Sequence, residues 1–161
     1  MEQQRQWRKL NGQRIMQPIS NEVKQAIEKE MVMGNRIQVC IGTDSQVKGT
    51  CIEFATVIVF IRKGNGGFMF ISKETQVQKM NIKERMMQEV NRSIEVAYEI
   101  NPILDSFNIN VEVHVDINTN EAFKSNAALK DAAGYVSGMG FQLKAKPQAF
   151  ASSSCANKIV Q

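Results

Sequence analysis

The pattern of apolar and polar residues predicts two strands that each close on an aspartate. The first run, IQVCIGTDSQ at 37–46, carries Asp44 near its end, and the second, VEVHVD at 111–116, carries Asp116 as its last residue. Because successive side chains of a strand point to opposite faces, each aspartate lies on the less apolar face. We therefore expect two buried strands, each delivering a carboxylate at its end.

The same periodicities predict the remaining elements. Helical spacing of apolar residues indicates helices at about 20–33, 81–100, 120–137 and 152–160, with Pro102 ending the second. β-Branched and aromatic residues predict further strands at about 51–62, 68–73 and 141–146. The glycine-rich segment 63–67 is typical of a hairpin turn.

The predicted element order is β-β-β-α-β-α-β-α. A meander followed by right-handed β-α-β crossovers is most simply built as a five-strand mixed sheet with helices on both faces. The crossover helix returns the fourth strand beside the first, which gives the strand order 3-2-1-4-5. Ligands of such open α/β sheets bind where the chain reverses direction, at the carboxyl ends of the strands. Asp44 and Asp116 are expected there.

The length of 161 residues suits one α/β domain, which we place at 20–161 behind a basic N-terminal arm at 1–19. Hydrophobic residues make up 43% and charged residues 22%, as in soluble globular proteins. Neither an apolar run of about 20 residues nor a signal-type leader is present, so we expect a cytoplasmic protein without membrane contact.

The arm concentrates positive charge. Residues 1–16 hold four basic residues against one acidic residue, together with Trp7. Such a segment can bind phosphate while its aromatic ring stacks on a base. The alternative is an ordinary solvated arm. The chain's three cysteines form no C-x-x-C pair, which argues against a disulfide framework and a zinc site and favours small buried side chains.

Three motifs in fixed order carry a family resemblance. The motifs are IGTDSQ at 41–46, HVDI at 114–117, and KAKP at 144–147 followed by ASS at 151–153. Together they resemble the YkuK-type family within the ribonuclease H-like superfamily, over about residues 20–160. The resemblance implies a nuclease-type fold in which carboxylates hold a divalent metal ion. A fold of this kind does not by itself imply activity.

A third carboxylate is predicted from helical geometry. At 100° per residue, the helix at 81–100 places most of its glutamates on the solvent side. Glu89 instead lies at the margin of the apolar stripe, where it can reach toward the two aspartates. The alternative is a boundary glutamate paired with Arg85 or Arg92.

Asp44, Glu89 and Asp116 are therefore our candidate catalytic and metal-binding residues. Mg²⁺ and Mn²⁺ prefer carboxylate oxygens, and metal-assisted phosphodiester hydrolysis needs several carboxylates at one point. We expect a metal-dependent nuclease acting on RNA or DNA. His114, the only histidine, lies one pleat behind Asp116 and is expected to support the site rather than to react.

The resemblance also exposes a departure. Active relatives are expected to contribute a fourth acid or a histidine from the last helix, which here offers only neutral groups such as Ser152, Ser153 and Asn157. These residues are expected to contact substrate, and so are four others nearer the strand ends: Ser45, Gln46, Lys124 and Ser125. Glu121 and Asp131 are possible substitutes for the acid. The alternative function is a catalytically weak or inactive nucleic-acid-binding or protein-interaction module.

Overall fold

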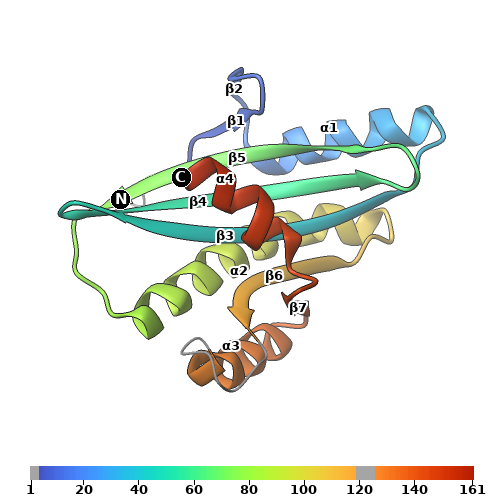
Figure 1. Cartoon of the computed structure of the whole chain (residues 1–161). Helices are drawn as coiled ribbons and strands as arrows, with labels where there is room; N and C mark the ends of the chain where they lie inside the picture. The colour runs from blue at the N-terminus through green and yellow to red at the C-terminus, as the bar shows by residue number, and fades with distance from the viewer. Residues whose placement is uncertain (1–3, 119–125) are drawn as a thin grey trace.

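The computed structural model describes residues 4–118 and 126–161 of the chain, and it contains a mixed sheet with helices on both faces (Figure 1). Its strands are β1 (Trp7–Lys9), β2 (Arg14–Ile15), β3 (Ile37–Lys48), β4 (Cys51–Arg62), β5 (Gly67–Gln76), β6 (Val111–Asn118) and β7 (Gln142–Lys146). Its helices are α1 (Ile19–Val32), α2 (Ile82–Ser106), α3 (Asn126–Gly138), the π-helix η1 (Ala151–Ala156) and α4 (Asn157–Val160).

The sheet has seven strands in the order β2-β1-β5-β4-β3-β6-β7. The five predicted strands take the expected relative order, β5-β4-β3-β6-β7, so the predicted core of the sheet is confirmed and the strand count was two too low. Strand β3 pairs antiparallel with β4 and parallel with β6. The topological switch point, from which the chain connections of the two neighbouring strands lead to opposite sides of the sheet, was predicted between the first and fourth strands. It lies between β3 and β6.

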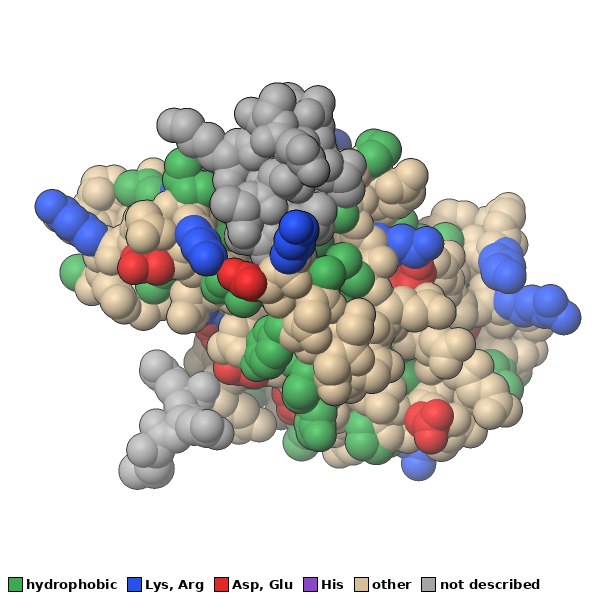
Figure 2. Space-filling view, turned by 90° about the horizontal axis from the view of Figure 1, so that it is seen from below, with side chains coloured by type: hydrophobic (Ala, Val, Ile, Leu, Met, Phe, Trp, Pro, Cys, Tyr) green, Lys and Arg blue, Asp and Glu red, His purple; other side chains and the backbone are tan. Residues whose placement is uncertain are grey.

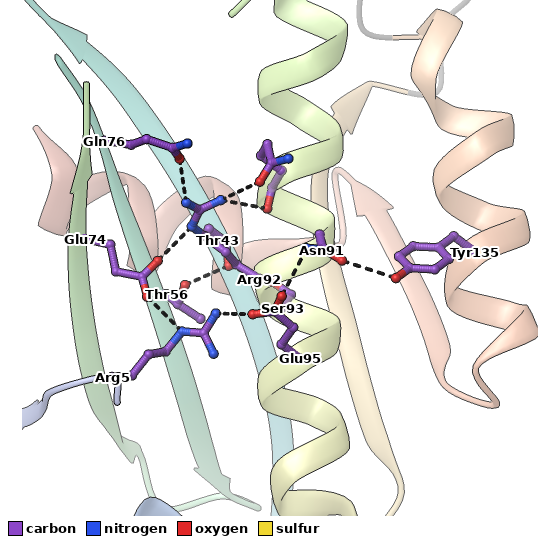
Figure 3. Close-up of polar contacts among 11 residues, drawn as sticks. Arg5, Thr43, Thr56, Glu74, Gln76, Asn91, Arg92, Ser93, Glu95 and Tyr135 are labelled. Carbon is purple, nitrogen blue, oxygen red and sulfur yellow. Dashed lines mark hydrogen bonds and ion pairs between the residues drawn. The ribbon is translucent and has the colours of Figure 1, made fainter. Parts of the chain in front are cut away.

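The two additional strands come from the segment expected to be a basic arm. β1 pairs with β5 and extends the sheet, and Trp7 is only 5% exposed within the main core. Trp7 is therefore not free to stack on a base. Arg5 pairs with Glu74, at 3.1 Å, and with Glu95, as Figure 3 shows. The segment is thus held by buried apolar surface and by ion pairs within the chain.

Each face of the sheet carries its own apolar core. Residues of α1, α2 and α3 pack with one face in the larger core, which includes Ile41, Ile94 and Val113. The η1 and α4 segment covers the other face in a smaller core that includes Cys40 and Val57, and Figure 1 draws this segment in red across β3 and β4. Alternate residues of β3 therefore meet different helices.

Helix α2 is longer than the sequence suggested. A capping box at Asn81 begins it, with the Asn81 side chain accepting from the Glu84 N–H and the Glu84 side chain accepting from the Asn81 N–H. The helix runs through Pro102, which we expected to end it. Ile100 and Leu104, on either side of the proline, are fully buried, and this burial offsets the lost backbone hydrogen bond. Among the described residues, no helix has the length and hydropathy to span a membrane.

Candidate active site

The site lies where β3 and β6 stop pairing. Their parallel ladder ends at the pair Gly42 and His114, and both strands continue beyond it. Asp44 and Asp116 are each two residues further on, so both project from the same face as that last pair. We had expected strand β3 to end at Asp44. It continues instead, because it pairs with β4 at every position as far as Lys48. Asp44 is 6% exposed.

Glu89 joins the site from α2, on the other face of the sheet. The Ser45 hydroxyl donates to Glu89 Oε1 at 2.5 Å, and one helical turn later Ser93 and Thr43 share a hydrogen bond of 2.7 Å. Figure 3 shows this second contact extended by the Thr43–Thr56 bond. These two hydrogen bonds, one helical turn apart, fix the position of α2 along β3. Arg92, which we considered as a partner for Glu89, pairs with Glu74 instead, at 2.8 Å.

The three carboxylates influence one another electrostatically. Burial raises the pKa of Glu89 to about 8, and the negative charges of Asp44 and Asp116 act in the same direction, against the Ser45 hydroxyl and Arg85. Burial also raises the pKa of Asp44, with a further contribution from Asp116. The three carboxylates thus come from separate elements and lie close enough for their charges to interact, in surroundings that favour added positive charge. This donor set fits a hard divalent cation such as Mg²⁺ or Mn²⁺.

The π-helix η1 packs closely on β3 and delivers the next residue of the site. A Cβ built at Gly42 would lie 2.4 Å from Ala151 C and from Ser152 N, so only glycine allows this approach. Directly after η1, Asn157 Nδ2 donates to Asp44 Oδ2 at 2.8 Å, and the Ser45 backbone N–H donates to Asp44 Oδ1 at 2.9 Å. Both Asp44 oxygens are therefore oriented, and these bonds oppose the rise in the pKa of Asp44.

His114, on β6, contacts the start of η1. Its Nδ1 accepts the Ala151 N–H at 3.2 Å, and its ring meets Phe150 edge-on at a centroid distance of 4.7 Å. Burial lowers the pKa of His114 to about 4, so the ring is neutral near pH 7 and can accept that bond. His114 thus fastens η1, and with it Asn157, to the sheet. Its role in the site stays a prediction.

A second group of side chains lies on the same face, further from Asp116. Cys40, Glu112 and His114 each offer one potential ligand atom, and these atoms lie within 4.8 Å of one another. Most of their bonding capacity is used within the chain, since Glu112 accepts from Gln38 and from the Cys40 thiol and the Ala151 N–H occupies His114 Nδ1, whereas His114 Nε2 is buried without a hydrogen-bond partner. We therefore regard this group as a buried polar cluster that holds η1 and β6 together.

The expected substrate-binding residues are divided by the structure. Ser45 is buried against Glu89, whereas Gln46 is exposed and shares the face of Asp44. Ser152 is fully buried, and its hydroxyl donates to the Ala149 carbonyl, which also accepts from Ser153. Gln46 is thus accessible to solvent, whereas the Ser152 side chain is not.

Four further candidates lie outside this group. Lys124, Ser125 and Glu121 are outside the described residues. Asp131, considered as a substitute acid, is 57% exposed on α3 and pairs with Lys83 at 3.2 Å, so it does not face the site.

Lys146 is the site residue that the sequence reasoning missed. It is the last residue of β7, and its Nζ lies 2.7 Å from Asp116 Oδ1 as an ion pair without the alignment of a hydrogen bond. The available signal was its position at the end of a strand predicted to lie beside the strand of Asp116. Figure 2, which views the molecule from below, shows lysine and arginine side chains dispersed over the face that it presents, with acidic ones between them. Among the described residues seen in this view, the basic groups form no continuous patch.

Comparisons with known proteins found a matching family model and a similar solved structure. A family model described as Ribonuclease H-like matches residues 15–161. No curated protein matches the sequence. One similar solved structure is RNase H1 from the halophilic archaeon Halobacterium salinarum NRC-1, with 18% sequence identity and a TM-score of 0.40. That match covers 71% of this chain and 89% of the archaeal chain.

Proposed function

This chain belongs to the ribonuclease H-like family, and from that premise we propose that it is a divalent-metal-dependent phosphodiester hydrolase acting on nucleic acid. The observation that carries the proposal is that Asp44, Glu89 and Asp116, from β3, α2 and β6, lie close enough for the charges of the two aspartates to raise the pKa of Glu89. Buried carboxylates that repel one another destabilise a metal-free protein. A bound cation removes that cost, so the arrangement favours a metal site over a purely structural one.

The three carboxylates would hold Mg²⁺ or Mn²⁺ through their oxygens. The bound ion would lower the pKa of a water molecule and neutralise charge on the phosphate. In the overall reaction a water oxygen bonds to phosphorus, the bond to the leaving oxygen breaks, and the proton that water gives up is matched by one that the leaving oxygen takes from solvent. The chain provides the fixed geometry for this reaction.

Neighbouring residues keep the carboxylates in place. Asn157 and the Ser45 N–H each donate to one oxygen of Asp44, and the Ser45 hydroxyl donates to Glu89. Orientation by fixed hydrogen bonds reduces the reorganisation needed when charge develops on a substrate. The exposed Gln46, on the face of Asp44, would contact the nucleic-acid strand next to the cleaved bond.

The proposal is tested by calorimetric titration of Mn²⁺ into wild type and the Asp44→Asn, Asp116→Asn, Glu89→Gln and Glu95→Gln variants. We expect the first three variants to fold without metal and to lose Mn²⁺ binding, because each removes a charged ligand. Glu95→Gln is the matched control, since it removes a half-exposed carboxylate from the same helix as Glu89. Loss of Mn²⁺ binding in the control, or its retention in Asp44→Asn, would contradict the proposed site.

Hydrolysis is measured separately on single-stranded and duplex RNA and DNA. The alternative function is a binding module with weak or no catalysis, and the observation that favours it is Asn157, a neutral donor at the place of a fourth acid. Cleavage that depends on Mn²⁺ and is abolished in Asp44→Asn supports the hydrolase. Binding of Mn²⁺ and nucleic acid without cleavage of any of the four substrates supports the module.

A further inference from the structure

We propose that the Lys146 ammonium group takes the place of a second metal ion and binds a non-bridging oxygen of the substrate phosphate. It would act beside a single divalent ion held by Asp44, Glu89 and Asp116. The inference rests on the proposed function and deepens it, because it specifies how many ions the site takes and which side chain recognises phosphate.

The first support is the position of the ammonium group. Lys146 Nζ lies 2.7 Å from Asp116 Oδ1, and the Lys146 side chain is 41% exposed whereas that of Asp116 is 18% exposed. The positive charge therefore lies between a largely buried carboxylate and solvent. A substrate arriving from solvent meets the ammonium group while it is still held by Asp116. Lysine suits phosphate here because it offers a compact charge with three donors.

The second support is the backbone that presents Lys146. β7 pairs with β6 in register from Glu112 to His114, and the register then shifts before Lys146 pairs with Asn118. This irregularity places Lys146 next to the segment of β6 that carries Asp116. Lys144, two residues earlier, lies 3.9 Å from Glu112 instead. Two lysines on one strand thus face two acids on the neighbouring strand, and only the Lys146 pair belongs to the site.

The third support is charge. Two divalent ions would bring four positive charges to a site with three carboxylates. Asn157, from the segment after η1, adds no charge and turns an N–H toward Asp44 Oδ2, and an N–H cannot coordinate a cation. The ammonium group already occupies the surroundings of Asp116 Oδ1. A second divalent ion at that oxygen would be repelled, so one ion and one lysine are the better match to this set of ligands.

The test uses the full chain in two measurements. Calorimetric titration with Mn²⁺ alone gives the number of ions per chain, and fluorescence anisotropy with a short single-stranded oligonucleotide in metal-free buffer gives affinity as a function of salt. The variants are Lys146→Met, Lys146→Arg and, as a matched control, Lys144→Met on the same strand. Circular dichroism checks that each variant is folded.

We expect wild type to bind one Mn²⁺. Lys146→Met should bind Mn²⁺ more tightly, because a competing charge is gone, and should bind the oligonucleotide with a salt slope smaller by about 0.7, the value of one lost phosphate contact on a single strand. Lys146→Arg should restore the slope, and Lys144→Met should leave both measurements unchanged. An arginine that restores the slope separates phosphate binding from a merely structural role.

Two Mn²⁺ ions per wild-type chain, or a wild-type salt slope in Lys146→Met, would overturn this inference and leave the proposed metal site intact. No Mn²⁺ binding by wild type would overturn the proposed function and the inference together. The two failures are therefore distinguishable from the wild-type titration.

Discussion

Replacing Glu89 by glutamine should change how the stability of the metal-free protein depends on pH. Glu89 is 7% exposed, and burial beside Asp44 and Asp116 raises its pKa from 4.5 to about 8. Between these two values the folded protein keeps a proton that the unfolded chain has released. The free energy of unfolding of wild type must therefore fall as the pH rises through this interval.

The magnitude follows from the interval. Each pH unit corresponds to about 1.4 kcal/mol, so ionisation of Glu89 in the unfolded chain alone lowers the free energy of unfolding by up to about 5 kcal/mol between pH 4.5 and pH 8. Glutamine has the same shape, can still accept from the Ser45 hydroxyl and does not titrate. Glu89→Gln should therefore resemble wild type at pH 4.5 and be more stable than wild type at pH 8.

Urea denaturation at intervals between pH 4.5 and pH 9, in a chelating buffer, measures this difference. Saturating Mn²⁺ at pH 8 should reverse the order, because the ion stabilises wild type by binding only its folded state and Glu89→Gln has lost a ligand. A difference in the free energy of unfolding between the two proteins that stays constant with pH would refute the reasoning. It would mean that the pKa of Glu89 is the same in the folded and the unfolded protein.

Three further perturbations test how the site is supported. Gly42→Ala should destabilise the protein by about 3 kcal/mol and weaken Mn²⁺ binding, because its Cβ would lie 2.4 Å from Ala151 C, whereas Gly134→Ala on α3, with no atom near its Cβ, should be neutral or stabilising in the same thermal denaturation. His114→Asn should lose less stability than wild type on acidification from pH 6.5 to pH 4 in urea titrations, because the wild-type histidine must take up a proton that its buried site disfavours. Trp7→Ala should lower the free energy of unfolding by about 3–5 kcal/mol in urea, since the ring lies in the main core.

The order of the central strands could be predicted because each local signal agreed with the topology. The alternation at 37–46 and 111–116, the glycine turn at 63–67 and the crossover helix leave few ways to build a sheet. β1 and β2 could not be predicted, because three and two residues are too few to display a period. The π-helix at Ala151–Ala156 could not be told from an α-helix by its sequence, because nothing in the residue pattern marks the wider hydrogen-bond spacing. The close approach of this segment to Gly42 appears only in the structure.

The candidate ligands were predicted from strand ends and helical angle, which are properties of single elements. The contacts that position them were not, because they join elements distant in sequence. Ser93 meets Thr43, and Asn157 meets Asp44, only after α2 and α4 have packed on opposite faces of the sheet. Lys146 reaches Asp116 through the register shift between β6 and β7, and no periodicity in the sequence records that shift.

Strand β3 makes the site intolerant of insertions and deletions in one part of the chain. All twelve of its residues pair with β4 without a bulge. The adjacent residues Asp44 and Ser45 point to opposite faces of the sheet. A single residue inserted or removed upstream of Asp44 within this ladder would turn the carboxylate toward α2 and the hydroxyl toward α4. Homologous chains should therefore vary in length at the β4–β5 turn, at 63–66, and keep a constant spacing between Ile37 and Ser45.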